Sequence, residues 1–324
     1  MKRIILPIFL GLIVLLNFWS GVLAYQIQDL TNIQVEGDVV LGPTKIELFL
    51  EPGETITREI TVTNRTGNTI NFKVEIEDFK GSHDPNQNII LMGEEKGPYS
   101  LRDWLRPGIR EFTLKHGQKI YLPIEISIPA ETEAGGHYGV VFASVQPPAV
   151  GVEGEKEKAK GQVAIVSRVG TLFFVRVAGE VEENGYLKEF KTPKNYYEKG
   201  PISFELLFEN NGSVHLTPYG AIEIFNFLGK QIGEVEVDPW FSMPDSLRKR
   251  EVNWEKGFLF GKYKALASIN RGYEDIIDQK SVDFWVIPWK IVSAGFIGLF
   301  LVILFFRWIF SRFEIKRKVT PTAP

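Results

Sequence analysis

The chain of 324 residues contains no cysteine and only four histidines. Without cysteine it can form neither a disulfide framework nor a thiolate metal site, so its domains need cores large enough to be stable without cross-links. The histidines stand at no metal-ligand spacing, neither i,i+4 nor clustered. We therefore expect no metal site and no cofactor. The four are His83, His116, His137 and His215.

Recognisable catalytic motifs are also missing. The sequence has no G-x-S-x-G elbow, no H-E-x-x-H pair, no phosphate-binding glycine loop and no EF-hand pattern. Acidic pairs such as Glu94 and Glu95 are ordinary on solvated strand surfaces. The formal net charge of −3 gives no electrostatic support for nucleic-acid binding. We expect a protein that is not an enzyme and has no nucleic-acid partner.

Both ends of the chain carry membrane patterns. Residues 1–24 combine Lys2 and Arg3 with an apolar run and a small residue at Ala24, which is typical of a signal peptide. An uncleaved N-terminal anchor is the alternative. Residues 287–309 form an apolar stretch long enough to cross a hydrocarbon core of about 30 Å. Aromatic residues stand at its margins, where interfacial side chains belong: Trp285, Trp289 and Trp308.

The charges that flank residues 287–309 predict its orientation. After this stretch the bases outnumber the single acid Glu314, which marks the tail at 310–324 as cytoplasmic. The bases are Arg307, near the end of this stretch, and Arg312, Lys316, Arg317 and Lys318 beyond it. We expect a single-pass protein of the cytoplasmic membrane with residues 25–286 outside. The tail is too short to fold, so the function must lie outside.

Alternation of apolar and polar residues predicts strands through most of the exterior region. Ile56, Ile60 and Val62 alternate with threonines and charged residues, and the β-branched content on both faces is typical of half-buried strands. We predict an all-β fold of two tandem immunoglobulin-like antiparallel β-sandwich domains followed by one C-terminal transmembrane helix. The expected domains span 33–179 and 180–286, and the helix spans 287–309.

Both predicted domains contain an alternating strand, an asparagine-containing turn and a second strand. This similarity indicates a weak internal repeat. Asn64-Arg65-Thr66 and Asn211-Gly212-Ser213 also match the N-glycosylation acceptor pattern. Turns require the same residue types for their backbone angles, so turn chemistry is the alternative explanation.

Four aromatic residues are candidate ligand contacts. Trp104 lies in a long loop, 80–108, and Tyr138 precedes a predicted strand. Trp240 and Phe241 stand side by side after a proline. Long loops at the ends of sandwiches often carry binding sites. The alternative for each residue is ordinary core packing.

Two stretches resemble a known family. LEPGETITREITVTNRTGNTINFKVEIEDF and FTLKHGQKIYLPIEISIPAETEAGGHYGVVF are similar to DUF916, the peptidoglycan-binding domain of WxL-interacting proteins on Gram-positive surfaces. NNGSVHLTPYGAIEIFN, MPDSLRKREVNW and FGKYKALASI resemble the module that follows in those proteins and binds the WxL partner. The matching positions in the first domain are Pro52, Gly53, Asn64, Pro129, Gly135 and Gly136.

The resemblance implies a role in adhesion or scaffolding at the cell surface, with cell-wall polymer (peptidoglycan), a surface protein, or both as partners. It identifies no contact residue. Our leading hypothesis is a membrane-anchored extracytoplasmic binding or scaffolding protein. The alternative is a periplasmic-chaperone-like assembly protein for surface structures, because strand-turn-strand modules with Val-Thr-Asn segments also resemble pilus chaperones.

Overall fold

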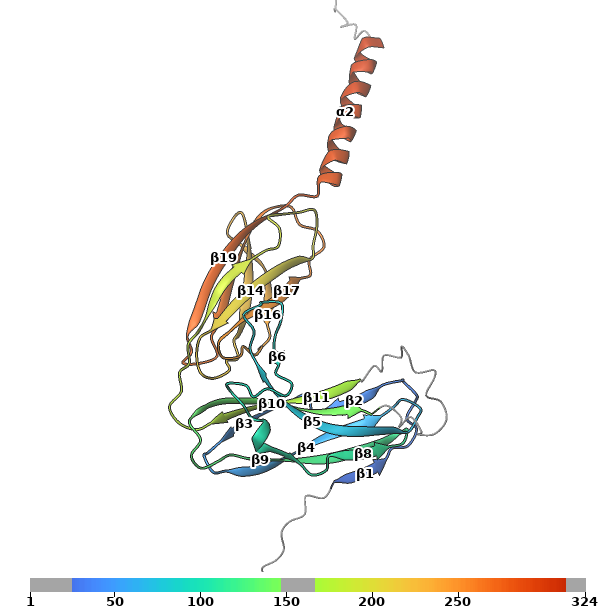
Figure 1. The fold of residues 1–324 in the computed structure, drawn as a ribbon. Helices are drawn as coiled ribbons and strands as arrows, with labels where there is room; N and C mark the ends of the chain where they lie inside the picture. Colours follow the sequence, from blue (N-terminus) through green and yellow to red (C-terminus); the bar gives the residue numbers. More distant parts are fainter. Residues whose placement is uncertain (1–24, 147–166, 313–324) are drawn as a thin grey trace, which may run out of the picture. The chain divides into compact units, whose positions relative to one another are not determined.

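The structure is a computed structural model that describes residues 25–146 and 167–312 (Figure 1). The predicted signal peptide at 1–24 and the predicted tail from residue 313 onward lie outside the described residues. The chain divides into two compact units. The first comprises the chain up to Lys80 together with Ile89–Glu182, and the second comprises Gly81–Asn88 together with the chain from Glu183 onward.

Two sheets form the first unit, and all of their strand pairs are antiparallel except that between β3 and β11. One sheet has the order β1 (Gln26–Asp29), β9 (Gln118–Ser127), β4 (Thr55–Asn64), β2 (Val39–Gly42), with β7 (Leu105–Pro107) also on β9. The other has the order β3 (Lys45–Leu50), β11 (Arg168–Val177), β10 (Gly135–Val145), β5 (Ile70–Lys80), β6 (Ile90–Leu91), with β8 (Glu111–Leu114) on β5.

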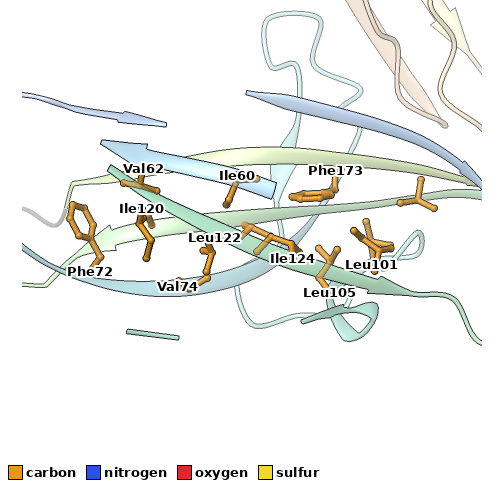
Figure 2. Close-up of a cluster of buried hydrophobic side chains, with 14 of the residues drawn as sticks. Ile60, Val62, Phe72, Val74, Leu101, Leu105, Ile120, Leu122, Ile124 and Phe173 are labelled. Carbon is orange, nitrogen blue, oxygen red and sulfur yellow. The ribbon is translucent and has the colours of Figure 1, made fainter. Parts of the chain in front are cut away.

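Alternating side chains from both sheets form the core of the first unit. In β4, Ile60 and Val62 are buried while the alternate residue Glu59 is exposed, and the partners opposite on β9 are the equally buried Leu122 and Ile120. Each such burial stabilises the fold by about 1.5–3 kcal/mol. Figure 2 shows the facing side chains of the other sheet in the same cluster, among them Phe72, Val74 and Phe173. The predicted β-sandwich is therefore present in this unit.

The second unit also contains two sheets. One has the order β12 (Gly185–Lys191), β14 (Ile202–Asn210), β17 (Ser246–Trp254). The other has the order β13 (Tyr196–Tyr197), β19 (Ile277–Val286), β18 (Gly261–Asn270), β15 (Tyr219–Asn226), β16 (Gln231–Val237). Phe204 and Phe208 of β14 are fully buried, and the Phe204 ring lies 5.8 Å from the ring of Phe284 on β19.

The C-terminal helix, α2, spans Trp289–Arg312. Within the described part of the chain it is the one helix long and apolar enough to cross a membrane, with 24 residues, a mean hydropathy of 2.2 and none of that apolar window buried. Only Ile287 and Pro288 separate it from β19. The prediction of a mostly β protein with one apolar C-terminal helix is confirmed, although the helix begins two residues later than expected. The immunoglobulin-like topology and the orientation across the membrane stay predictions.

A buried asparagine holds the first strand-turn-strand unit together. Asn64 ends β4 with no exposed surface. Its Nδ2 donates to the carbonyl oxygens of Asn68, at 2.7 Å, and Leu114, at 2.8 Å, while its Oδ1 accepts the N–H of Thr66 at 3.0 Å. Because the amide nitrogen already has two acceptors, turn chemistry explains this asparagine without glycosylation.

The second unit repeats this arrangement at Asn210, the last residue of β14. Its Nδ2 donates to the carbonyl oxygens of Val214, at 2.9 Å, and Ser242, at 3.0 Å, and its Oδ1 accepts the N–H of Gly212 at 3.0 Å. Asn210 is fully buried, whereas its neighbour Asn211 is exposed. The internal similarity seen in the sequence thus corresponds to the same hydrogen-bonding role in both units.

Candidate binding site

The two aromatic residues predicted as contacts in the first unit lie in or against its core. Tyr138 is fully buried, and its ring lies 5.8 Å from Phe79, 5.9 Å from Tyr99 and 5.6 Å from Phe174. A ring with no exposed surface offers no contact to a ligand, so Tyr138 has a packing role in this structure. Trp104 is half-buried and packs against the hydrophobic cluster.

A buried carboxylate orders the long loop that carries Trp104. Asp78 has no exposed surface and accepts the backbone N–H groups of Gly97, Leu101 and Arg102 at 3.1, 3.0 and 2.9 Å. Trp104 closes a 3₁₀ turn at Arg102–Trp104. These three bonds hold the part of the 80–108 segment that leads into Trp104.

The ring of Trp104 packs against a half-buried histidine. Its centroid lies 4.4 Å from that of His137, whose Nδ1 is 3.2 Å from the carbonyl oxygen of Ser100. Burial lowers the pKa of His137, because the charged imidazolium would lose its hydration there. This corner of the first unit therefore favours a neutral imidazole and a packing role.

The aromatic pair in the second unit is divided between core and surface. Trp240 is buried, with its ring 6.3 Å from that of Phe208 in an edge-to-face arrangement. Phe241 is half-buried, and the Arg248 guanidinium lies 5.2 Å from the centre of its ring. Of the four predicted contacts, Phe241 is the one that the structure places beside a strand edge with unsatisfied polar groups.

That edge belongs to β17, which pairs with β14 along all nine of its residues and with no other described strand. Leu247 donates its backbone N–H away from β14, to the carbonyl oxygen of Ser82 at 2.9 Å. Because alternate residues of an antiparallel strand direct their N–H and C=O groups to the same side, Lys249, Glu251 and Asn253 also direct theirs outward. These outward groups have no strand partner among the described residues.

Two arginines project from the inner face of this edge strand. Arg248 and Arg250 lie directly opposite Phe208 and Leu206, which are core residues of β14. Residues directly opposite each other in a sheet share a face, so both side chains point between the two sheets at the open side of the sandwich. Apolar side chains are the norm at such positions.

The arginine pair is poorly neutralised. The Nε atoms of Arg248 and Arg250 are buried without a hydrogen-bond partner among the described residues. The nearest carboxylate, that of the exposed Asp238, lies 3.9 Å from Arg250 Nη2. Burial, followed by repulsion from Arg250, lowers the pKa of Arg248. Buried donors without acceptors are uncommon and costly, so this pair is a candidate for binding an external anionic group.

A hollow of about 350 Å³ adjoins the pair. It is lined by residues 248–251 of β17 and by Pro85, Asn86 and Asn88 from the segment Gly81–Asn88. The segment fits closely onto the start of β17, since a Cβ on Gly81 would lie 2.4 Å from the Cβ of Ser246. Glycine is therefore required there. The segment forms one wall of the hollow, and the basic edge forms the other.

The sequence of β17 itself carries a signal for this site. In a strand whose inner face carries the half-buried Val252 and the buried Trp254 at alternate positions, the same alternation places Arg248 and Arg250 on that face. Two bases at inward positions depart from the usual pattern of strands. Among the residues that the structure describes, no group of three or more His, Cys, Asp or Glu side chains could hold a metal ion. The candidate site consists of the outward backbone groups of β17 and the two guanidinium groups.

No protein-family model matches the chain, and no curated protein matches it. Similar solved structures include the class 5 fimbriae chaperone CfaA, with 10% identity over 78% of this chain and 100% of the other at a TM-score of 0.36. The E. coli chaperone DraB has 15% identity over 76% and 96% at 0.31. The Pseudomonas aeruginosa CupB2 chaperone has 10% identity over 76% and 100% at 0.33. Similarity at these scores supports no argument about this chain.

Proposed function

We propose that this protein is a membrane-anchored extracytoplasmic binding protein that holds an extended segment of a partner polypeptide along the edge of β17 from Lys249 to Asn253, beyond the Leu247 amide that Ser82 already occupies. The observation that carries the proposal is the edge itself. β17 pairs on one side only, and it presents outward backbone groups beside two arginines whose Nε atoms have no partner among the described residues. Addition of a strand from a partner satisfies such an edge.

The charge of the edge favours a segment with acidic side chains. An incoming strand would place every second side chain on the inner face, where Arg248 and Arg250 lie about 6.7 Å apart along the strand. Guanidinium groups bind carboxylates through short, paired N–H bonds. A segment with Asp or Glu at alternate positions therefore matches both the backbone edge and the arginine pair. Phe241 would contribute an apolar surface next to them.

The helix α2 supplies the anchor in this proposal. Its length of 24 residues corresponds to about 36 Å, more than the roughly 30 Å of a hydrocarbon core. Its flanking bases favour a cytoplasmic C-terminus. The binding edge then lies outside the cell, where surface proteins are assembled or displayed.

The chaperone-like alternative uses the same edge. A scaffold retains its partner, whereas an assembly protein releases it to another strand donor, so the two differ in the lifetime of the complex. Peptidoglycan, which the family resemblance implies, is a different class of partner and is measured separately in the test below.

The test uses the full chain in detergent micelles and two synthetic peptides. One is a strand-forming peptide with glutamate at alternate positions, and the other is the same peptide with glutamine in their place. We expect the glutamate peptide to bind at least about tenfold more tightly, since bonds to charged groups contribute roughly 1.5–3 kcal/mol. Binding that does not distinguish the two peptides would contradict the assignment of the arginine pair.

Variants locate the site. The double variant Arg248→Gln with Arg250→Gln should abolish the preference for the glutamate peptide. The control double variant Lys262→Gln with Lys264→Gln changes the net charge by the same amount on the other sheet and should leave that preference intact. Glu251→Pro removes one outward N–H without removing a hydrogen bond to β14, and it should weaken the binding of both peptides.

Two further assays use the same variants: capture of surface proteins and pelleting with insoluble wall polymer. Pelleting that survives both the arginine and the proline changes would favour the wall-polymer reading over the proposal. Rapid exchange of a captured partner for a competing peptide would favour the assembly reading.

A further inference from the structure

The end of the second unit from which α2 emerges carries a cluster of exposed apolar side chains. The loop between β15 and β16 presents Phe227 and Leu228, with exposed fractions of 71% and 75%. The loop between β17 and β18 presents Phe258 and Phe260, with exposed fractions of 71% and 59%. We call these four residues the apolar tip. Four large apolar side chains left in water on two neighbouring loops indicate a surface that contacts something.

Strand register places both loops beside the start of the helix. Gly261 begins β18 and pairs with Val286, the last residue of β19. Phe260 immediately precedes Gly261, and a Cβ on Gly261 would lie 3.9 Å from the Phe227 side chain. Phe227, Phe260 and Val286 therefore lie at one level of the second unit.

The link to α2 is short and fixed. Val286 and Trp289 are three residues apart, so their Cα atoms lie within about 11 Å of each other. The Ile287 N–H donates to the carbonyl oxygen of Tyr197 at 2.8 Å, and Lys290 Nζ lies 2.9 Å from Glu198 Oε1. These contacts tie the first turn of the helix to β13 and the residue after it.

We propose that the apolar tip inserts into the interfacial zone of the membrane that α2 crosses, so that the second unit rests on the bilayer surface. This inference depends on the membrane span in the proposed function. The headgroup zone is about 5–8 Å thick on each side. A sandwich end held within about 11 Å of the helix start is close enough for its projecting loops to reach this zone. Phenylalanine and leucine on interfacial loops are stabilised there by burial of their apolar area.

The opposite end of the same sheet differs in character. β18 and β19 are ten residues long, so their other turn lies about 34 Å away. That turn, Arg271–Ile276, exposes Glu274 and Asp275. Ile277 follows it and is 57% exposed, which makes it a matched position at the far end. The apolar side chains thus gather at the end that is covalently held to the membrane.

The experiment uses the absence of cysteine, which permits a single labelled position in the full chain. Gly257→Cys places a fluorophore in the β17–β18 loop, where nothing lies within 4 Å of an added Cβ, and Ile277→Cys labels the far end. Each protein is reconstituted into vesicles of equal parts phosphatidylcholine and phosphatidylglycerol, with and without a lipid that carries a nitroxide on the upper acyl chain. We expect several-fold stronger quenching at position 257 than at position 277.

Serine in place of all four residues of the apolar tip should lower quenching at position 257 toward that at position 277. In the protein with its natural apolar tip, quenching could be equal at the two positions while the protein still floats with the vesicles after alkaline extraction. That result would overturn this inference alone. Failure to float would overturn the membrane span and this inference together. The comparison of positions 257 and 277 does not depend on the serine variant folding.

Discussion

Replacing Asn210 with alanine removes a buried amide that joins three segments of the second unit. The amide connects the end of β14 to the turn at Gly212, to Val214 and to Ser242. The three hydrogen bonds measure 2.9 to 3.0 Å, and the side chain has no exposed surface. Ser242 follows Phe241 directly in the chain, so the same amide also positions one side of the proposed binding edge.

The expected cost follows from these three bonds. Each buried hydrogen bond contributes about 1 kcal/mol net, so their loss destabilises the second unit by about 3 kcal/mol. Asn211→Ala is the matched control, because Asn211 is the exposed neighbour. A surface substitution of this kind changes stability by no more than about 0.5 kcal/mol.

Hydrogen exchange measured by mass spectrometry on the full chain in micelles reports the second unit separately from the first. A loss of about 3 kcal/mol raises the exchange rate of globally protected amides in β14 by about 100-fold. Peptides from the first unit serve as an internal reference and should not change. If Asn210→Ala and Asn211→Ala give the same protection in β14, the buried amide does not hold these segments and the reasoning is refuted.

Three further outcomes are expected. Burial lowers the folded-state pKa of His137 below its ordinary 6.5, so the stability of the first unit is complete above pH 6.5 and falls as the pH drops through the lowered folded-state pKa. His137→Gln should therefore reduce the loss of stability at acid pH. Thermal unfolding measured across pH tests this, and an unchanged pH dependence in the variant would refute it. Gly81→Val should place its side chain against Ser246, lower the free energy of unfolding by about 1–3 kcal/mol and speed hydrogen exchange of the Leu247 amide. Gly257→Val, where the added side chain meets open space, should have neither effect. Equal effects of the two substitutions would argue against the close fit at Gly81. Asp78→Ala should leave three backbone N–H groups without their acceptor and lower the free energy of unfolding by about 3 kcal/mol. Proteolysis within residues 80–108 should then be faster than in the control Glu95→Ala. Unchanged cleavage would mean that other contacts hold the loop.

Local sequence patterns were sufficient to predict the long strand β4 and the helix α2. The period-two alternation in TITREITVTN predicts a strand with one buried face, and β4 spans those ten residues, Thr55–Asn64. The apolar run near the C-terminus predicts a helix long enough to span a membrane, and α2 occupies it. Both signals are local, because each depends only on side-chain spacing along one element.

The aromatic candidates show where local patterns fail. Trp240 and Phe241 are adjacent in the chain, yet one is buried against Phe208 and the other lies under a guanidinium group at the border of the sandwich. Tyr138 lies in a strand covered on both faces. Exposure of a single ring depends on what the rest of the chain places over it, and spacing in the sequence does not contain that information.

The sequence by itself determined the class of elements, the apolar C-terminal helix and the repeated asparagine turn, since these follow from propensity, length and periodicity. Tertiary structure decided which strand edges stay open, because pairing joins residues far apart in the chain. It placed Arg248 and Arg250 on the inner face of an edge strand and brought Phe227 next to Gly261. The proposed sites depend on these long-range contacts, which form only when the sheets have assembled.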